Sequence, residues 1–137
     1  MKHVIIVIDD MADDRKLVRL LLRKYDCQVL EAACAADGLK LAQKTKPHLI
    51  LIDHMMPQGN GYDSIRHFRE DPELRLVPII MLTSRKFDAG FRDFMRQNID
   101  DFLAKPVESK TLLDAIQARI GALRLAPAPA APAAVGR

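Results

Sequence analysis

The sequence predicts an α/β domain built around a five-stranded parallel sheet that carries helices on both faces. Short apolar segments alternate with helical patterns along most of the 137 residues, a length that suits one domain. The first of these segments, Val4–Ile8, is a continuous β-branched run, as expected for a strand buried on both faces. Hydrophobic residues make up 49% of the chain and charged residues 28%, which favours a globular protein over a disordered one.

The expected strands are short. The pattern places them at Val4–Ile8, Gln28–Glu31, Leu49–Ile52, Ile79–Leu82 and Asp101–Ala104. The apolar runs fall far short of the roughly 20 residues that cross a bilayer, so we expect no membrane segment. The first residues are unlike a signal peptide, and Cys27 and Cys34 form neither a metal motif nor a disulfide framework. A cytoplasmic location is therefore expected.

The expected helices lie between and after these strands. They cover Asp13–Tyr25, Ala35–Lys46, Tyr62–Arg69, Phe87–Arg96 and Ser109–Leu123. Pro47 is expected to end the second helix and Ser109 to cap the last one. Alanine and proline fill nine of the twelve positions from 126 to 137. We therefore expect a domain over residues 1–125, followed by a flexible tail or linker over 126–137.

The net charge of +3 does not by itself indicate a nucleic-acid partner. Basic residues of the first expected helix alternate with leucines at helical spacing, which favours a solvated helix face. No aromatic residues interleave with them in the manner of single-strand binders. The sequence also has no Gly-rich phosphate loop, so nucleotide binding is not predicted.

Charged and hydroxyl residues stand where four of the predicted strands end. In chain order they are Asp9 and Asp10, Asp53, Thr83 and Ser84, and Lys105. Ligands of open α/β sheets bind beyond the carboxyl ends of the strands, so we expect these side chains to converge on one crevice. Alone, an aspartate pair is commonly a turn and a threonine-serine pair a helix cap. Their joint placement is what predicts a site.

Three carboxylates, a hydroxyl pair and an ammonium in one crevice suit phosphoryl transfer. A hard divalent cation relieves the repulsion among close carboxylates. Mg²⁺ prefers oxygen ligands and typically joins carboxylates to a phosphate. The ammonium and a hydroxyl then receive the oxygens of the transferring group, while one carboxylate acts as the nucleophile. We therefore predict Mg²⁺, or Mn²⁺ in its place, as the cation.

From about Lys2 to Leu123 the chain resembles the receiver domains of bacterial response regulators, the chemotaxis regulators among them. The resemblance rests on Val-Ile-Asp-Asp at 7–10, Asp-His-Met-Met-Pro at 53–57 with Gly61 beyond it, Leu-Thr-Ser at 82–84 and Lys-Pro at 105–106. It implies a flavodoxin-like fold, a doubly wound (βα)5 arrangement with strand order 2-1-3-4-5. It also implies a cis bond between Lys105 and Pro106.

The resemblance implies roles at the phosphoryl group. Asp53 is the expected phosphoacceptor. Lys105 is expected to pair with the phosphoryl group and Thr83 to hydrogen-bond to it. Phe102 matches the aromatic switch position, where this chain has no tyrosine hydroxyl to offer.

The resemblance further implies the metal ligands, which are Asp9, Asp10, Asp53 and the backbone carbonyl of Met55. Met55 and Arg85 each lie two residues beyond a site residue, at the positions that tune phosphoryl lifetime in this family. A thioether and a long cation at these positions imply a modulated rate of hydrolysis.

By the same resemblance, the domain takes a phosphoryl group from a sensor histidine kinase or a histidine phosphotransfer protein in two-component signalling. It then switches the face formed by the helix over Phe87–Arg96, the strand over Asp101–Ala104 and the helix over Ser109–Leu123, and so controls a downstream protein partner or a fused output domain. The domain catalyses only its own phosphorylation and dephosphorylation, and contacts neither nucleic acid nor membrane directly. Charged residues on the expected output face are candidates for a phosphorylation-dependent homodimer: Arg92, Arg96, Asp100, Asp101, Lys110 and Arg119.

Two other classes of protein share parts of this pattern. Phosphatases of the dehalogenase type also use a strand-end aspartate. They share a second aspartate two residues later, and this chain has Met55 at that position. A degenerate receiver that serves only as an interaction scaffold would lack Asp10, Asp53, Thr83 or Lys105. All four are present.

Overall fold

The computed structural model describes residues 2–53, 61–83, 93 and 96–126, and the side chains of residues 61–63 are not described. The strands are β1 (His3–Ile8), β2 (Cys27–Ala32), β3 (Leu49–Asp53), β4 (Ile79–Thr83) and β5 (Asp101–Ala104). The helices are α1 (Ala12–Leu22), α2 (Ala35–Thr45), α3 (Gly61–Glu70) and α5 (Ser109–Ile120). The predicted helix over Phe87–Arg96 falls mainly outside the described residues, of which 93 and 96–98 are helical.

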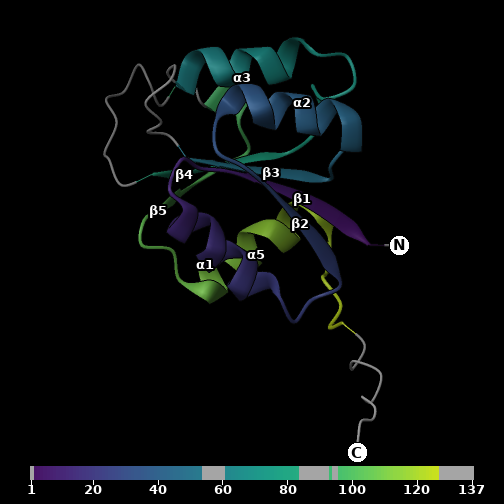
Figure 1. Cartoon of the computed structure of the whole chain (residues 1–137), viewed down its shortest axis with the longest axis vertical. Coiled ribbons are helices and arrows are strands. Elements are labelled where there is room, and N and C mark those ends of the chain that lie inside the picture. The colour runs from purple at the N-terminus through teal and green to yellow at the C-terminus, as the bar shows by residue number, and fades with distance from the viewer. Residues whose placement is uncertain (1, 54–60, 84–92, 94–95, 127–137) are drawn as a thin grey trace, which may run out of the picture.

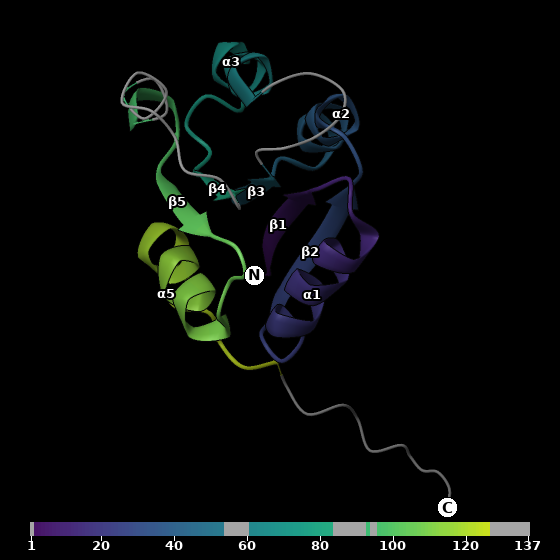
Figure 2. The ribbon, with the colours of Figure 1, turned by 90° about the vertical axis from the view of Figure 1, so that its left-hand side faces the viewer.

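The five strands form one parallel sheet in the order β2-β1-β3-β4-β5, which confirms the predicted α/β fold and strand order. Helices α2 and α3 cover one face of this sheet, and α1 and α5 cover the other (Figures 1 and 2). No helix within the described ranges has both the length and the apolar character that crossing a membrane requires.

The sheet is buried on both faces. Every residue of β3 and β4 is buried, which explains why these strands are continuous apolar runs and do not alternate. One core cluster includes Ile6, Ile52 and Phe68, and the cluster on the opposite face includes Val7, Leu51 and Leu112. Successive strand residues therefore supply opposite layers.

The strand register brings the carboxyl ends together. Asp53 pairs with Leu82, so the last residue of β3 lies beside the end of β4. Thr83 pairs with Ala104, the residue before Lys105. Ile8 pairs with Ile52, which places Asp9 next to the end of β3. The sheet thus positions all four segments that were predicted to carry the site.

Gly38, in α2, permits a close approach to the strand that leads into the acidic residues. A Cβ atom at this position would lie 2.3 Å from Cδ1 and 2.7 Å from Cγ1 of Ile8, whose side chain is fully buried. We expect Gly38→Ala to lower the free energy of unfolding by about 1–3 kcal/mol, because overpacking outweighs the better helix propensity of alanine. Chemical denaturation measures this, with Ala36→Gly as a comparison within the same helix. An unchanged or higher stability would contradict the packing.

Two helices end three residues earlier than predicted, whereas the other boundaries of α1, α2, α3 and α5 lie within one residue of the predictions. Helix α1 ends at Leu22 and not at Tyr25, because Tyr25 forms an antiparallel bridge with Leu125. Helix α5 ends at Ile120 and not at Leu123. Gly121 follows it with φ of 90°, a conformation that favours glycine and ends the helix.

The prediction that Ser109 caps the last helix was wrong. Ser109 is the first helical residue of α5, and Glu108 occupies the N-cap position in an extended conformation. No side chain caps this end by a hydrogen bond. The predicted N-cap lies one residue after the observed one. A serine in the first helical turn fits the same sequence pattern as a serine at the N-cap.

The chain beyond α5 remains attached to the domain as far as Ala126. Leu123 is buried in the core, and its N–H donates to Oε1 of Gln117. The Asp26 N–H donates to the carbonyl of Arg124, and the Ala126 N–H donates to that of Lys24. The tail predicted over 126–137 lies outside the described residues apart from Ala126.

Candidate phosphoryl-transfer site

Three aspartates form a cluster at the carboxyl edge of the sheet. Asp9 and Asp10 follow β1, and Asp53 is the last residue of β3. Each offers a carboxylate oxygen, and these three oxygens all lie within 4.8 Å of one another. Asp9 is 2% exposed and Asp53 7%, so two of the carboxylates are removed from water.

Backbone contacts fix Asp9 at the end of its strand. The Asp9 N–H donates to the carbonyl of Ala32, which continues the β1–β2 pairing by one residue. The N–H of Met11 donates to Oδ1 of Asp9 at 2.9 Å. Arg15 donates to the Asp9 carbonyl at 2.6 Å and also pairs with Glu31 of β2. These hydrogen bonds connect the turn between β1 and α1 to β2 and to the start of α1.

Lys105 lies against this cluster. Its Nζ atom is 2.8 Å from Oδ1 of Asp53, 3.0 Å from Oδ2 of Asp9 and 2.9 Å from Oδ2 of Asp14. Its side chain is only 20% exposed. Pro106 follows in a cis peptide, as the resemblance implied.

The buried charges shift one another's ionisation. Burial raises the pKa of Asp53 above the ordinary value, and the charges of Asp9 and Asp10 add to this rise. The hydrogen bond from Lys105 opposes it. Burial lowers the pKa of Lys105, but hydrogen bonds to Asp53, Asp14 and Asp9 outweigh burial, so its pKa is raised overall. Lys105 is therefore a cation at neutral pH and favours the ionised form of Asp53.

Thr83 and Phe102 lie on the strands beside the acidic cluster. Thr83 is buried at the end of β4, and its carbonyl accepts a hydrogen bond from the Lys105 N–H at 2.8 Å. Phe102 lies on β5 opposite Met81 and packs partly buried against the core. Met55, Arg85 and Ser84 lie outside the described residues.

Asp14 was missed in the sequence analysis. It lies in the first turn of α1, where an acidic residue is ordinarily attributed to the helix dipole. Its position four residues after Asp10 was the available signal, because the first turn of that helix borders the carboxyl edge of the sheet. The structure shows that its carboxylate pairs with Lys105.

The aspartate cluster fits a hard divalent cation. All three ligating groups are carboxylates, the donors that Mg²⁺ prefers, and their oxygens are close enough to share one ion. Two of them are buried, and an ion is an effective way to offset charges that Lys105 alone does not balance. Among the described residues, no other group of three or more histidine, cysteine, aspartate or glutamate side chains has this geometry.

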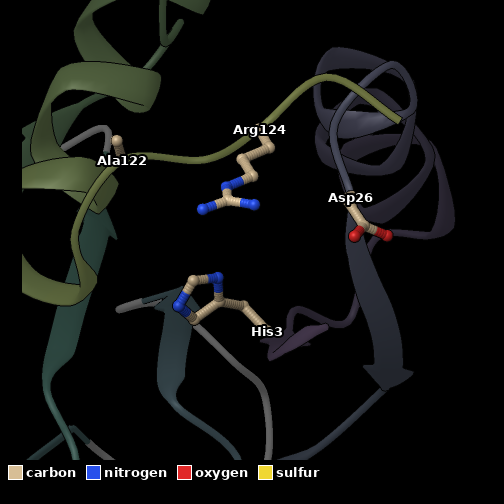
Figure 3. A pocket seen from close by; sticks show the side chains of 4 residues that line it. All are labelled: His3, Asp26, Ala122 and Arg124. Carbon is tan, nitrogen blue, oxygen red and sulfur yellow. The ribbon is translucent and has the colours of Figure 1, made fainter. Parts of the chain in front are cut away.

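A second polar pocket, of about 310 Å³, lies at the other end of the strands. It is lined by His3, Asp26, Ala122 and Arg124 (Figure 3). His3 begins β1 and Asp26 precedes β2, so this pocket is on the edge of the sheet opposite the aspartate cluster. The Arg124 guanidinium points toward the His3 ring (Figure 3), and none of the four lining residues belongs to the aspartate cluster.

The fold and the aspartate cluster together define a receiver domain. Residues 5–117 match the family model described as response regulator receiver domain, so the chain belongs to that family. Receiver domains belong to two-component signalling and are not conventional enzymes.

Protein PilH of Pseudomonas aeruginosa is 34% identical over 83% of this chain and 94% of its own length. Protein PilG of the same organism is 33% identical over 85% of this chain and 86% of its own length. The chemotaxis protein CheY4 of Vibrio cholerae has a TM-score of 0.80 at 25% identity, covering 87% of this chain and 99% of that one.

One solved relative contains a metal. The receiver domain of the sensor histidine kinase PA1611 from Pseudomonas aeruginosa was solved with a magnesium ion coordinated in its active-site cleft. It has a TM-score of 0.79 and 25% identity, covering 89% of this chain and all of that one.

Proposed function

We propose that this receiver domain accepts a phosphoryl group on Asp53 from the histidine of a sensor kinase or a phosphotransfer protein, with Mg²⁺ bound. The observation that carries the proposal is the position of Asp53. Its buried carboxylate lies between a cluster fit for a cation on one side and the Lys105 ammonium on the other. Positioning and charge compensation are what phosphoryl transfer requires.

Asp53 is the nucleophile in this proposal. Lys105 and a cation hold its carboxylate ionised, so an oxygen lone pair is available to attack phosphorus. The new O–P bond forms as the N–P bond of the donor phosphohistidine breaks, and the imidazole leaves. Lys105 then passes from the carboxylate to a phosphoryl oxygen. Thr83 follows Leu82, the β4 partner of Asp53, and in this proposal it donates its hydroxyl to another phosphoryl oxygen.

Asp9, Asp10 and Asp53 would hold the cation through their carboxylate oxygens. Mg²⁺ offsets the negative charge that accumulates as the phosphoryl group approaches three carboxylates. The proposal includes the backbone carbonyl of Met55 as a further ligand. Met55 and Arg85 border the site in this proposal and tune phosphoryl lifetime by restricting water.

The phosphorylated state changes the face formed by the predicted helix over Phe87–Arg96 together with β5 and α5. Thr83 and Phe102 are the switch residues: Thr83 turns toward the phosphoryl group, and Phe102 repacks on β5. Phe102 is half-buried at present, so a change in its burial alters the surface that a partner meets. The output partner is a downstream protein or a fused domain, and a homodimer that forms on phosphorylation remains a prediction, as does a cytoplasmic location.

Intact-mass measurement tests this proposal. With a small-molecule phosphodonor and Mg²⁺, the wild type is expected to gain one phosphoryl mass and Asp53→Asn none. Removal of Mg²⁺ with a chelator is expected to abolish the gain. Asp63→Asn serves as the control and should gain the same mass as the wild type. A wild type that gains no mass, or an Asp53→Asn variant that gains it fully, would refute the proposal.

A further inference from the structure

Among the described residues, Lys105 has one carboxylate partner that is not part of the metal cluster. An ammonium has three N–H donors, and three carboxylates lie within hydrogen-bond distance of this one. Asp9 and Asp53 belong to the group of oxygens suited to a cation. Asp14 does not belong to it, and its side chain is 44% exposed at the start of α1.

The other two partners change when the site is used, and in this the inference rests on the proposed function. The Asp9 carboxylate binds the cation. Asp53 becomes an acyl phosphate, and the N–H it accepted passes to a phosphoryl oxygen. Asp14 takes part in neither event, so neither of them removes its 2.9 Å contact with Lys105.

We infer that Asp14 is a positioning residue, which anchors the Lys105 ammonium over the site while the ammonium exchanges Asp53 for the phosphoryl group. Asp14 touches neither the phosphoryl group nor the metal. It acts through Lys105, by leaving a flexible four-carbon side chain with one fixed contact during the exchange.

The surroundings of Lys105 make such an anchor necessary. Its side chain borders a cavity of about 290 Å³ between α1 and α5, and most of the lining is apolar, including Leu17, Leu82 and Leu112. Asp9 and Asp14 supply the carboxylates of this lining. Without Asp14, the third N–H would face apolar walls or open water, and the side chain would gain freedom to leave the site.

The helix dipole does not account for Asp14. Asp13 lies in the same first turn and carries the same charge, so both residues complement the N-terminus of α1. Only Asp14 pairs with Lys105 among these two. Asp13 is exposed and is therefore a matched control, with equal effect on the helix and on net charge.

The kinetic test compares Asp14→Ala with Asp14→Asn. Both remove the charge, which alters attraction of an anionic donor equally, but the asparagine oxygen still accepts the N–H from Lys105. We expect the maximal rate of phosphorylation by a small phosphodonor to be about fivefold lower in Asp14→Ala than in Asp14→Asn, which corresponds to ~1 kcal/mol. The Mg²⁺ concentration for half-maximal rate should be the same in both, and Asp13→Ala should match the wild type in maximal rate.

A second test needs neither metal nor phosphodonor. The Lys105 ammonium should give a ¹⁵N NMR signal protected from water exchange in the wild type and in Asp14→Asn, and lose that protection in Asp14→Ala. Equal rates and equal protection in the alanine and asparagine variants would overturn the inference. So would a shift in Mg²⁺ dependence confined to Asp14→Ala, which would make Asp14 part of the metal site. A wild type that is not phosphorylated would refute the proposed function alone, because the NMR result still decides whether Asp14 anchors Lys105.

Discussion

Lys105→Met is expected to lower the free energy of unfolding by about 3 kcal/mol at pH 7 in the absence of divalent cations. Methionine has a similar length but offers no charge and no donor. The substitution leaves the buried carboxylates of Asp9 and Asp53 without the Lys105 ammonium. An unpaired buried charge is costly. Partial exposure of Asp14 limits its share of the loss.

The stability deficit of Lys105→Met should depend on pH, in a direction that follows from the ionisation of Asp53. The pKa of Asp53 is already raised in the folded protein, so the folded state binds more protons than the unfolded state above about pH 3.9. Stability from this group therefore falls as pH rises through its folded pKa. Loss of Lys105 raises the folded-state pKa of Asp53 further, and so widens the pH range over which stability falls. The deficit of Lys105→Met should thus shrink as pH is lowered from 7 to 5.

Chemical denaturation at both pH values measures the effect. Lys110→Met is the matched control, since Lys110 is 85% exposed and its ion-pair partner among the described residues is the surface residue Asp114. We expect that control to change stability by less than about 1 kcal/mol. If Lys105→Met were as stable as the control at pH 7, the charge balance described for the site would be wrong.

Asp10→Asn is expected to raise stability without Mg²⁺ and to remove the stabilisation that Mg²⁺ gives. In the metal-free protein, Asp10 adds to the negative charge around Asp53, so neutralising it relieves repulsion. In the presence of Mg²⁺, binding to the folded state alone stabilises the wild type by about 2.7 kcal/mol when the ion is at 100 times its dissociation constant. The variant lacks a ligand for the cation and should gain far less.

The two proteins should therefore exchange rank when Mg²⁺ is added. Thermal unfolding with Mg²⁺ and with a chelator measures this, and Asp13→Asn controls for the loss of one nearby negative charge. The prediction fails if Mg²⁺ stabilises Asp10→Asn as strongly as it stabilises Asp13→Asn. It also fails if the metal-free Asp10→Asn protein is less stable than the wild type.

The sequence was sufficient for the sheet and most of the site because both depend on short-range patterns. Buried parallel strands must be continuous apolar runs, and β3 and β4 have that form. Once the strands are known, their carboxyl ends share one edge of the sheet. Asp9, Asp53 and Lys105 were predicted to meet for that reason. The Lys105 Nζ atom lies 3.0 Å from Oδ2 of Asp9 and 2.8 Å from Oδ1 of Asp53.

The contacts that escaped prediction depend on side-chain direction or on segments far apart in the chain. Asp14 reaches Lys105 across 91 residues, and Asp13 in the same helical turn has the same side chain, so residue type alone did not distinguish the two. The end of α1 is set by the pairing of Tyr25 with Leu125, which a local helical pattern cannot report. The cap at Ser109 failed by one residue, which is within the usual uncertainty of helix ends.

The most direct test of the account is to locate the phosphoryl group on the chain. Phosphorylated wild-type protein is treated with borohydride, whose hydride reduces an acyl phosphate to an alcohol and releases phosphate. Trypsin then yields the peptide 45–66, which contains Asp53 and one other aspartate, Asp63. Tandem mass spectrometry is predicted to place the reduced residue at Asp53. Reduction at Asp63, or in any peptide other than this one, would contradict the account.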